Sequence, residues 1–313
     1  MRHPLPRPGR PFLTDGGIET TLIFHEGVDL PHVAAFVLLA EADGIARLRA
    51  YYERYIAIAK RAGTGFVLES PTWRASSDWA ERLGLPLAEL DRLNARAIGL
   101  MQELRRAHAT PATPMVVSGC VGPRGDGYQP GSRLMPPDEA QFYHARQIGA
   151  FADAGADMIA AITMTNVPEA IGLVSAAGVA GLPVAVSFTV ETDGTLPTGE
   201  PLGEAIAAVD DATGAAPAFY MINCAHPTHF ADALAVDAPW VGRIGGLRAN
   251  ASKLSHADLD EAPELDTGNP AELGAEHRAL LARLPNLAVL GGCCGTDHRH
   301  VEAIADACLG VAA

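Results

Sequence analysis

The sequence predicts a single (β/α)8 barrel. Short apolar runs typical of buried strands alternate with longer alanine- and leucine-rich segments of helical periodicity. Eight such strands occur in a chain of 313 residues that is 48% hydrophobic, which is enough for one large core. Alternating strands and helices produce parallel sheets with right-handed crossovers. An open doubly wound sheet is the alternative, but no Gly-x-Gly-x-x-Gly motif follows the first strand.

The elements follow one another along most of the chain. Residues 1–11 are rich in proline and arginine and predict an irregular arm, so that residues 12–313 form the single domain. Residues 244–270 are polar with little periodicity and predict a long loop after the seventh strand. The predicted strands are Pro11–Asp15, Gly65–Glu69, Pro114–Gly119, Met158–Ile162, Val184–Thr189, Ala218–Asn223, Trp240–Gly245 and Leu287–Leu290, and the predicted helices include Ile45–Ala62, Leu87–Ala107, Glu139–Ala154, Val167–Ala177 and Gly203–Ala212.

Charge and composition exclude several classes of partner. The formal net charge of -14 argues against nucleic acid and anionic membranes, which attract basic surfaces. No signal-peptide pattern opens the chain, and no apolar run is long enough to span a bilayer. Five cysteines, an odd number in a long chain, make a poor disulfide framework and fit a reducing cytoplasm. We therefore expect a cytoplasmic protein whose partners are small molecules, and the sequence makes no prediction of oligomeric state.

Polar residues gather where the predicted strands end. Active sites of (β/α)8 barrels lie at the carboxyl ends of the strands. The ends of strands one, two, six and eight carry the motifs Asp15-Gly16-Gly17, Glu69-Ser70-Pro71-Thr72-Trp73, Asn223-Cys224 and Cys293-Cys294. These residues are therefore expected to meet at the mouth of the barrel.

The cysteines predict a metal site. Cys293 and Cys294 stand between glycines, and on a regular strand their side chains would point to opposite faces. A bend that the flanking glycines permit would bring both thiols to one point. With Cys224 they form a three-sulfur zinc site with one open position, the arrangement of a catalytic zinc. A thiol bound at the open position would be deprotonated and could attack a methyl carbon.

Other interpretations of these residues stay open. The spacing Cys224-x-His226-x-x-His229 could bind metal through one cysteine and two histidines. Free cysteines are also commonly buried apolar side chains. We interpret Cys120 as packing beside the site and Cys308 as part of the core.

The motifs at the strand ends, together with Gly291-Gly292-Cys293-Cys294-Gly295-Thr296, resemble the homocysteine S-methyltransferase family over about residues 12–308. The resemblance implies a (β/α)8 barrel that holds zinc through Cys224, Cys293 and Cys294. It implies methylation of a zinc-bound homocysteine thiolate by a sulfonium or betaine donor, as in methionine biosynthesis. It also places a set of residues beside the substrate: Asp15, Gly16, Gly17, Thr72, Trp73, Asn223 and Asn250.

One position departs from the family pattern. Members of the family usually carry a glutamate after strand four that contacts the amino group of homocysteine, and Ile162 takes its place here. Loss of a charge-assisted contact costs about 1.5–3 kcal/mol. Glu191 and Glu69 are the candidate replacements. Alternatively the acceptor is another thiol or a selenol, the reaction is a demethylation, or the protein binds zinc or thiols without catalysis.

Three further residues near the strand ends are candidates for substrate contacts. Arg124 and Tyr128 lie in a glycine-rich loop after strand three, which could bring them toward the substrate or serve as a polar lid. Arg248 could bind a substrate carboxylate through two hydrogen bonds or form a surface salt bridge.

Overall fold

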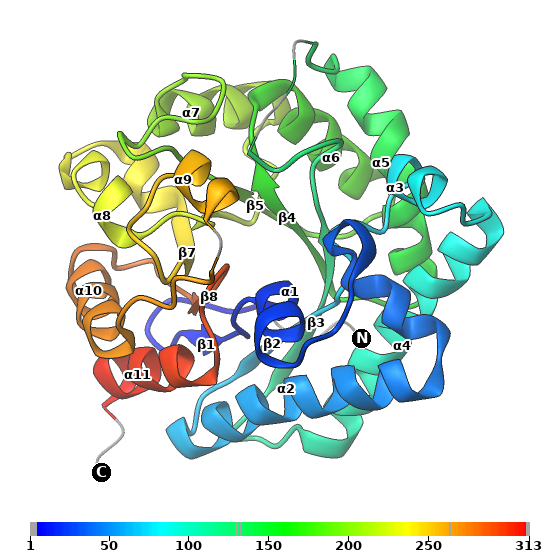
Figure 1. The fold of residues 1–313 in the computed structure, drawn as a ribbon. Coiled ribbons are helices and arrows are strands. Elements are labelled where there is room, and N and C mark those ends of the chain that lie inside the picture. Colours follow the sequence, from blue (N-terminus) through cyan, green and yellow to red (C-terminus); the bar gives the residue numbers. More distant parts are fainter. Residues whose placement is uncertain (1–4, 129–130, 132, 263, 311–313) are drawn as a thin grey trace.

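The computed structural model describes residues 5–128, 131, 133–262 and 264–310. Its parallel strands close into a barrel in the order of the sequence (Figure 1), which confirms the predicted fold. The first and last strands pair through Phe12 with Val289 and Leu13 with Leu290. The strands are β1 (Phe12–Leu13), β2 (Phe66–Glu69), β3 (Met115–Val121), β4 (Met158–Met164), β5 (Val184–Phe188), β6 (Phe219–Asn223), β7 (Ile244–Ala249) and β8 (Val289–Gly292).

Helices form the outer layer of the molecule. Apolar stripes at helical spacing place residues such as Leu93 and Ile98 against the sheet. The α-helices are α1 (Ile18–Thr20), α2 (Ala42–Ala62), α3 (Ser77–Arg82), α4 (Leu87–His108), α5 (Pro137–Asp153), α6 (Val167–Val179), α7 (Leu202–Thr213), α8 (Pro227–Phe230), α9 (His256–Glu261), α10 (Pro270–Arg283) and α11 (His298–Leu309). Shorter turns of 3-10 or π-helix are η1 (Thr21–His25), η2 (Pro31–Val33), η3 (Ala35–Ala40), η4 (Ala233–Ala235) and η5 (Pro239–Arg243).

The seventh strand corrects the sequence prediction. Trp240–Gly245 was expected to be a strand, but Pro239 opens the turn η5 and the strand β7 begins only at Ile244. The indole of Trp240 instead packs where Gly203 of α7 leaves room for it. The predicted loop 244–270 is therefore shorter than expected, because it begins with β7 and contains the helix α9.

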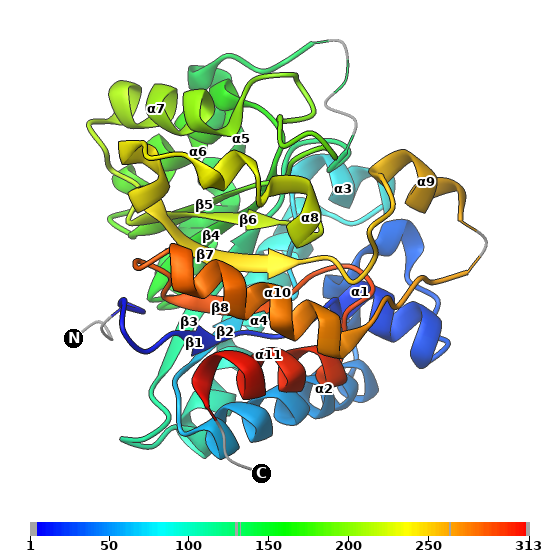
Figure 2. The same ribbon diagram turned by 90° about the vertical axis from the view of Figure 1, so that its left-hand side faces the viewer.

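The carboxyl ends of the strands open toward one side of the barrel. Figure 2 shows the arrow of β7 pointing to the side on which α1 and α9 lie. Inside the barrel, a small apolar cluster that includes Val116, Met158 and Ile162 fills the space below that opening. The larger apolar core lies between the sheet and the helices.

Residues 5–11 of the predicted arm form no helix or strand, and residues 1–4 lie outside the described part of the chain. Leu5 packs against the apolar cluster inside the barrel. Among the described residues, no helix combines the length and the apolar character that crossing a membrane would require.

Candidate active site

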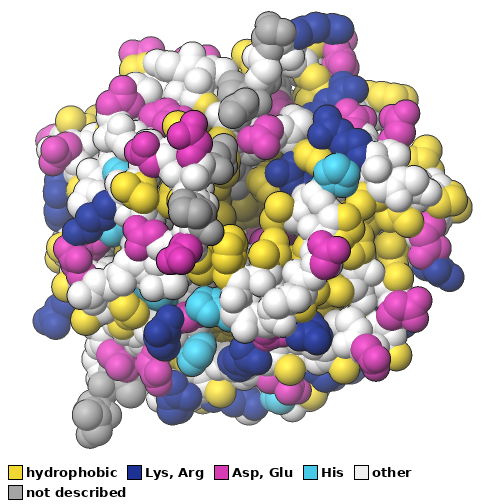
Figure 3. Space-filling model, in the orientation of Figure 1, with side chains coloured by type: hydrophobic (Ala, Val, Ile, Leu, Met, Phe, Trp, Pro, Cys, Tyr) yellow, Lys and Arg dark blue, Asp and Glu magenta, His cyan; other side chains and the backbone are white. Residues whose placement is uncertain are grey.

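A cavity of about 300 Å³ opens at the carboxyl ends of the strands. Figure 3 shows the hollow at the centre of this face, with hydrophobic side chains inside it. A volume of this order accommodates a small ligand. The cavity contains most of the residues that the sequence predicted as a site: Asp15, Gly16, Gly17, Glu69, Thr72, Trp73, Cys224, Cys293 and Cys294.

Three cysteines meet in the wall of this cavity. Cys224 directly follows β6, and Cys293 and Cys294 directly follow β8. Their sulfur atoms all lie within 4.8 Å of one another. The Sγ atoms of Cys224 and Cys294 are 3.9 Å apart, and those of Cys224 and Cys293 are joined as a disulfide. This pairing is confined to the sulfur cluster, and Cys120, Cys294 and Cys308 are free.

The cluster fits a tetrahedral metal once its sulfurs are reduced. Four ligands at a Zn–S distance of about 2.3 Å place sulfur atoms about 3.8 Å apart. The Cys224–Cys294 separation matches this value. Thiolates select soft or borderline metals such as zinc over calcium or magnesium. Three sulfurs beside a cavity would leave a fourth position for a ligand from the cavity.

The glycines around the cysteines serve close packing more than backbone freedom. Gly291 and Gly292 have no positive φ, and only Gly295 does, at +76°. A Cβ on Gly291 would lie 3.0 Å from the carbonyl oxygen of Asp15, and one on Gly17 would lie 2.6 Å from that of Cys293. The motif therefore has small residues because β8 and the loop after β1 touch through their backbones.

Cys224 carries the unusual backbone instead. Its φ is +52°, a conformation rare for residues with a side chain. Asn250 donates a hydrogen bond to its carbonyl oxygen at 3.0 Å, and Nε2 of His256 lies 2.6 Å from the same oxygen. Asn250 thus stabilises the backbone of Cys224, a metal-ligand candidate, and does not line the cavity. His256, at the start of α9, contacts the same carbonyl oxygen, and the sequence made no prediction for it.

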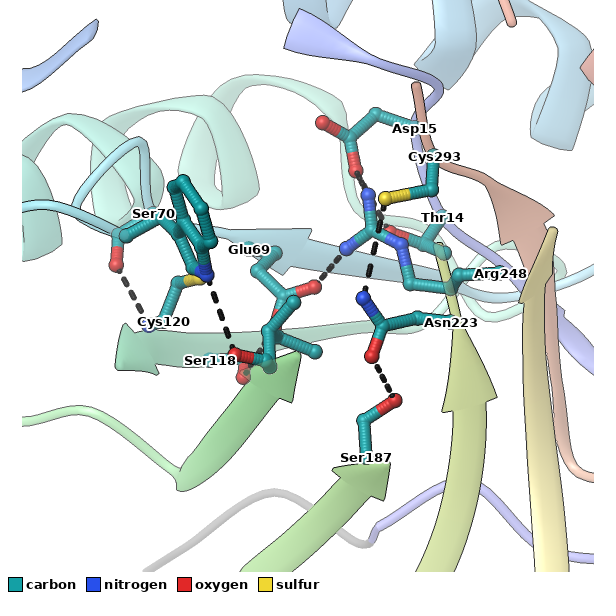
Figure 4. Close-up of polar contacts among 12 residues, drawn as sticks. Thr14, Asp15, Glu69, Ser70, Ser118, Cys120, Ser187, Asn223, Arg248 and Cys293 are labelled. Carbon is teal, nitrogen blue, oxygen red and sulfur yellow. Dashed lines mark hydrogen bonds and ion pairs between the residues drawn. The ribbon is translucent and has the colours of Figure 1, made fainter. Parts of the chain in front are cut away.

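Asn223 holds a second strained residue. Thr163, at the end of β4, has a φ of +63° although it is β-branched. The Asn223 side chain accepts a hydrogen bond from the Thr163 amide at 2.9 Å and donates one to its hydroxyl at 2.8 Å. Figure 4 also shows its contacts with Ser187 and with Cys293, whose Sγ lies 3.8 Å from its amide nitrogen. Asn223 therefore links the end of β4 to the cysteine cluster.

A buried ion network lies beneath the cysteines. Arg248 of β7 donates to Asp15 at 2.7 Å and also pairs with Glu69 (Figure 4). Arg248 thus lies inside the protein and binds two of its own carboxylates, which corrects the alternative of a surface salt bridge. Burial opposes its charge, but the carboxylates of Asp15 and Glu69 hold the pKa of Arg248 above its usual value. Burial raises the pKa of Glu69 to about 7, against the pull of Arg248.

The remaining cavity wall is largely apolar or aromatic. Trp73 donates its indole N–H to the carbonyl of Ile162 at 3.2 Å, and the Thr72 hydroxyl donates to the carbonyl of Cys120 at 2.8 Å. The Tyr128 hydroxyl lies 3.5 Å from Sγ of Cys294. Burial raises the pKa of the Cys294 thiol, and the contact with Tyr128 opposes this rise.

Several candidates lie outside the cavity wall. Glu191 is 3.3 Å from Nδ1 of His256 and does not line the cavity. His226 faces Glu276 at 3.3 Å, and burial lowers its pKa to about 4. Among the described residues, the cysteine cluster is the one potential metal-binding group, and it includes neither His226 nor His229. Arg124 pairs with Asp78 and Glu139 away from the cysteines.

Glu19 is an ionisable cavity residue for which the sequence made no prediction. It lies on α1, two positions after Gly17, and lines the cavity beside the cysteines. Burial raises its pKa to about 7. Its place just behind the Asp15-Gly16-Gly17 motif was the available signal, but without the fold it resembled an ordinary carboxylate in the first turn of a helix.

Glu19 is expected to destabilise the fold at neutral pH. A carboxyl group with a folded pKa near 7 and an ordinary value of 4.5 binds more protons when folded, so its contribution to stability falls as pH rises from 4.5 to 7. Glu19→Gln should therefore raise the free energy of unfolding by about 1–3 kcal/mol at pH 8 and by much less at pH 5. Urea unfolding at both pH values measures this. Glu81→Gln, at an exposed site, is the control, and an equal gain at both pH values would contradict the assignment.

Taken together, the fold and the cavity define a (β/α)8-barrel protein with a three-cysteine centre at its mouth. Residues 12–308 match the profile of the family described as Homocysteine S-methyltransferase. The chain belongs to the homocysteine S-methyltransferase family and is a methyltransferase.

Individual relatives agree with this assignment. The chain is 26% identical over 323 aligned residues to Homocysteine S-methyltransferase 4 of Zea mays, covering 94% of this chain and 88% of the relative. The oxidised form of the homocysteine methyltransferase MmuM from Escherichia coli has a TM-score of 0.74 and 22% identity, with 94% of each chain covered. The metallated form of MmuM has a TM-score of 0.70 and 20% identity, covering 95% of this chain and 96% of that one. At such identities the two structures support the fold.

Proposed function

We propose that the protein methylates a small thiol, with homocysteine as the first candidate, at a zinc centre formed by Cys224, Cys293 and Cys294. The convergence of the three sulfur atoms on a ligand-sized cavity is the observation that supports this proposal. When bound there, zinc would lower the pKa of a coordinated thiol so that its thiolate is available as the nucleophile. The three cysteines would leave one position for that thiol.

The reaction is a displacement at carbon. A new bond forms between the acceptor sulfur and the methyl carbon, while the bond from that carbon to the donor's sulfonium sulfur or quaternary nitrogen breaks. The donor atom keeps the electron pair and becomes neutral, and the acceptor's thiol proton is released to solvent. The cavity would hold the two partners in line, and its largely apolar wall would limit the access of water. Methionine is the product if the acceptor is homocysteine.

A second candidate has another thiol as acceptor. Ile162 is buried and lines the cavity, so the end of β4 offers no charge to an amino group there. Of the two candidate replacements, Glu69 is engaged by Arg248 and Glu191 faces His256. This observation favours a panel of acceptors, including thiols without an amino group, over a single substrate.

Zinc loading is expected to depend on reduction. Because Cys224 and Cys293 are paired in this structure, they must be reduced before both can be ligands. Protein treated with a thiol-free reductant should bind about one equivalent of zinc and methylate homocysteine from S-methylmethionine or a betaine. Untreated oxidised protein should do neither. Reduced, zinc-loaded protein that methylates no thiol in the panel would refute the proposed function. The same requirement supports a reducing compartment such as the cytoplasm.

A further inference from the structure

We propose that Glu19 binds the positively charged group of the ligand that occupies the barrel mouth. The inference deepens the proposed function, on which it rests, by assigning a charge to the ligand and a residue that recognises it. The shared chemistry is a cationic group in the ligand. It is carried either by the amino group of an acceptor thiol or by the sulfonium or quaternary nitrogen of a methyl donor.

The position of Glu19 is fixed by contacts to the cysteine loop. The neighbouring Thr20 hydroxyl accepts a hydrogen bond from the amide of Gly295 at 3.2 Å. The amide of Gly17 donates to the carbonyl of Thr296 at 3.0 Å. The short helix α1 is therefore attached to the segment that follows Cys294, and Figure 1 shows it over the centre of the barrel. Glu19, on this helix, lines the same cavity as the three cysteines.

Burial acts on Glu19 more strongly than the nearby cations do, since the charges of Arg248 and Arg74 lower its pKa by less than burial raises it. Among the described residues, no ion pair or side-chain hydrogen bond to its carboxylate is present. Arg248 is engaged by Asp15 and Glu69. The other arginine of the cavity wall, Arg74, donates to the carbonyl of Gly125 at 3.2 Å and stacks on two tryptophan rings.

Acidic groups predominate among the charged side chains of the cavity. Its wall contains four carboxyl groups and two guanidinium groups, so acidic side chains outnumber basic ones. The carboxyl groups are those of Asp15, Glu19, Glu69 and Asp126, and the cations are Arg74 and Arg248. Burial disfavours the charged form of the Glu19 carboxylate, so a cationic ligand would gain from meeting it.

The size of the cavity limits the distance between Glu19 and the cysteines, since about 300 Å³ holds only a small ligand. A ligand whose sulfur lies at the cluster would therefore present a cation only a short distance along its chain. Ile162 lines a different part of the wall and offers no charge, so the positively charged group of the ligand would be stabilised at Glu19 and not at the end of β4.

Binding calorimetry on the reduced, zinc-loaded protein tests the inference without relying on turnover. The acceptor probes are homocysteine and 4-mercaptobutanoate, which is the same thiol acid without the amino group. Wild-type protein should bind homocysteine at least about 10-fold more tightly, the range of a charge-assisted hydrogen bond. Glu19→Gln should remove most of this preference while leaving the affinity for 4-mercaptobutanoate unchanged. Glu81→Gln should behave as wild type.

A second arm separates the two sources of the cation. If Glu19→Gln keeps the preference for homocysteine but weakens binding of S-methylmethionine about 10-fold, Glu19 recognises the donor. Adding Ile162→Glu to Glu19→Gln should restore the affinity that was lost, because it returns a carboxylate to the cavity. Circular dichroism confirms that each variant is folded, and Glu19→Asp provides a conservative comparison.

Glu19→Gln changing neither affinity would overturn the inference. That result differs from failure of the proposed function, which is a wild-type protein that binds these ligands but methylates no thiol.

Discussion

Cys294→Ser is expected to abolish zinc binding and thiol methylation. Cys294 lies 3.9 Å from Cys224, and its sulfur is in the same cavity wall as the other two. A serine hydroxyl is a poor ligand for a metal held by thiolates. Zinc content should fall from about one equivalent to near zero. Activity should fall by more than about 100-fold, since even changes to the residues that support ligands cost 10–100-fold.

The matched control for this experiment is Cys308→Ser. Cys308 lies on α11 and is partly buried against the core, outside the cavity wall. It should keep both zinc and activity and lose only a little stability. Metal content measured by plasma emission, together with methylation rates, separates the two cases. A Cys294→Ser protein that retains a full equivalent of zinc would show that the metal is held elsewhere.

Arg248→Met is expected to cause a large loss of stability. It would leave the buried carboxylates of Asp15 and Glu69 without their cation. Breaking a buried ion pair by removing one partner costs about 3–5 kcal/mol. Urea unfolding at pH 8 measures this loss. Arg61→Met is the control, because its pair with Glu302 is exposed and such pairs contribute about 0–1 kcal/mol.

The pH dependence of the Arg248→Met effect identifies its cause. With a pKa raised by burial to about 7, Glu69 takes up a proton as the pH falls through that value. A protonated carboxyl group needs no counter-charge, so the destabilisation caused by Arg248→Met should be smaller at pH 5 than at pH 8. A loss that is independent of pH would mean that lost packing of the arginine stem, and not charge, is responsible.

Much of the architecture could be predicted because each strand is a local feature. Runs such as Val184–Phe188 are apolar, short and followed by helical patterns, and seven of the eight strands were located closely in this way. The exception is instructive. The strand β7 contains a buried arginine, Arg248, so its sequence is not a continuous apolar run. The apolar residues Trp240 and Val241 lie just before it and have the composition of a strand, although they belong to the turn η5. A charge can occupy a barrel strand only where carboxylates from other strands neutralise it, and a local pattern does not contain that information.

The sequence by itself determined the barrel and the three cysteines of the centre. Their residue types are chemically unusual, and the strand-end rule brought them together without coordinates. Only the tertiary structure decided the charge balance of the cavity. It tied Glu69 to Arg248, placed Glu191 outside the wall and left Glu19 inside it without an ion pair among the described residues. The reason is physical: a carboxylate's role depends on its burial and on the charges around it, and those neighbours come from strands far apart in the chain.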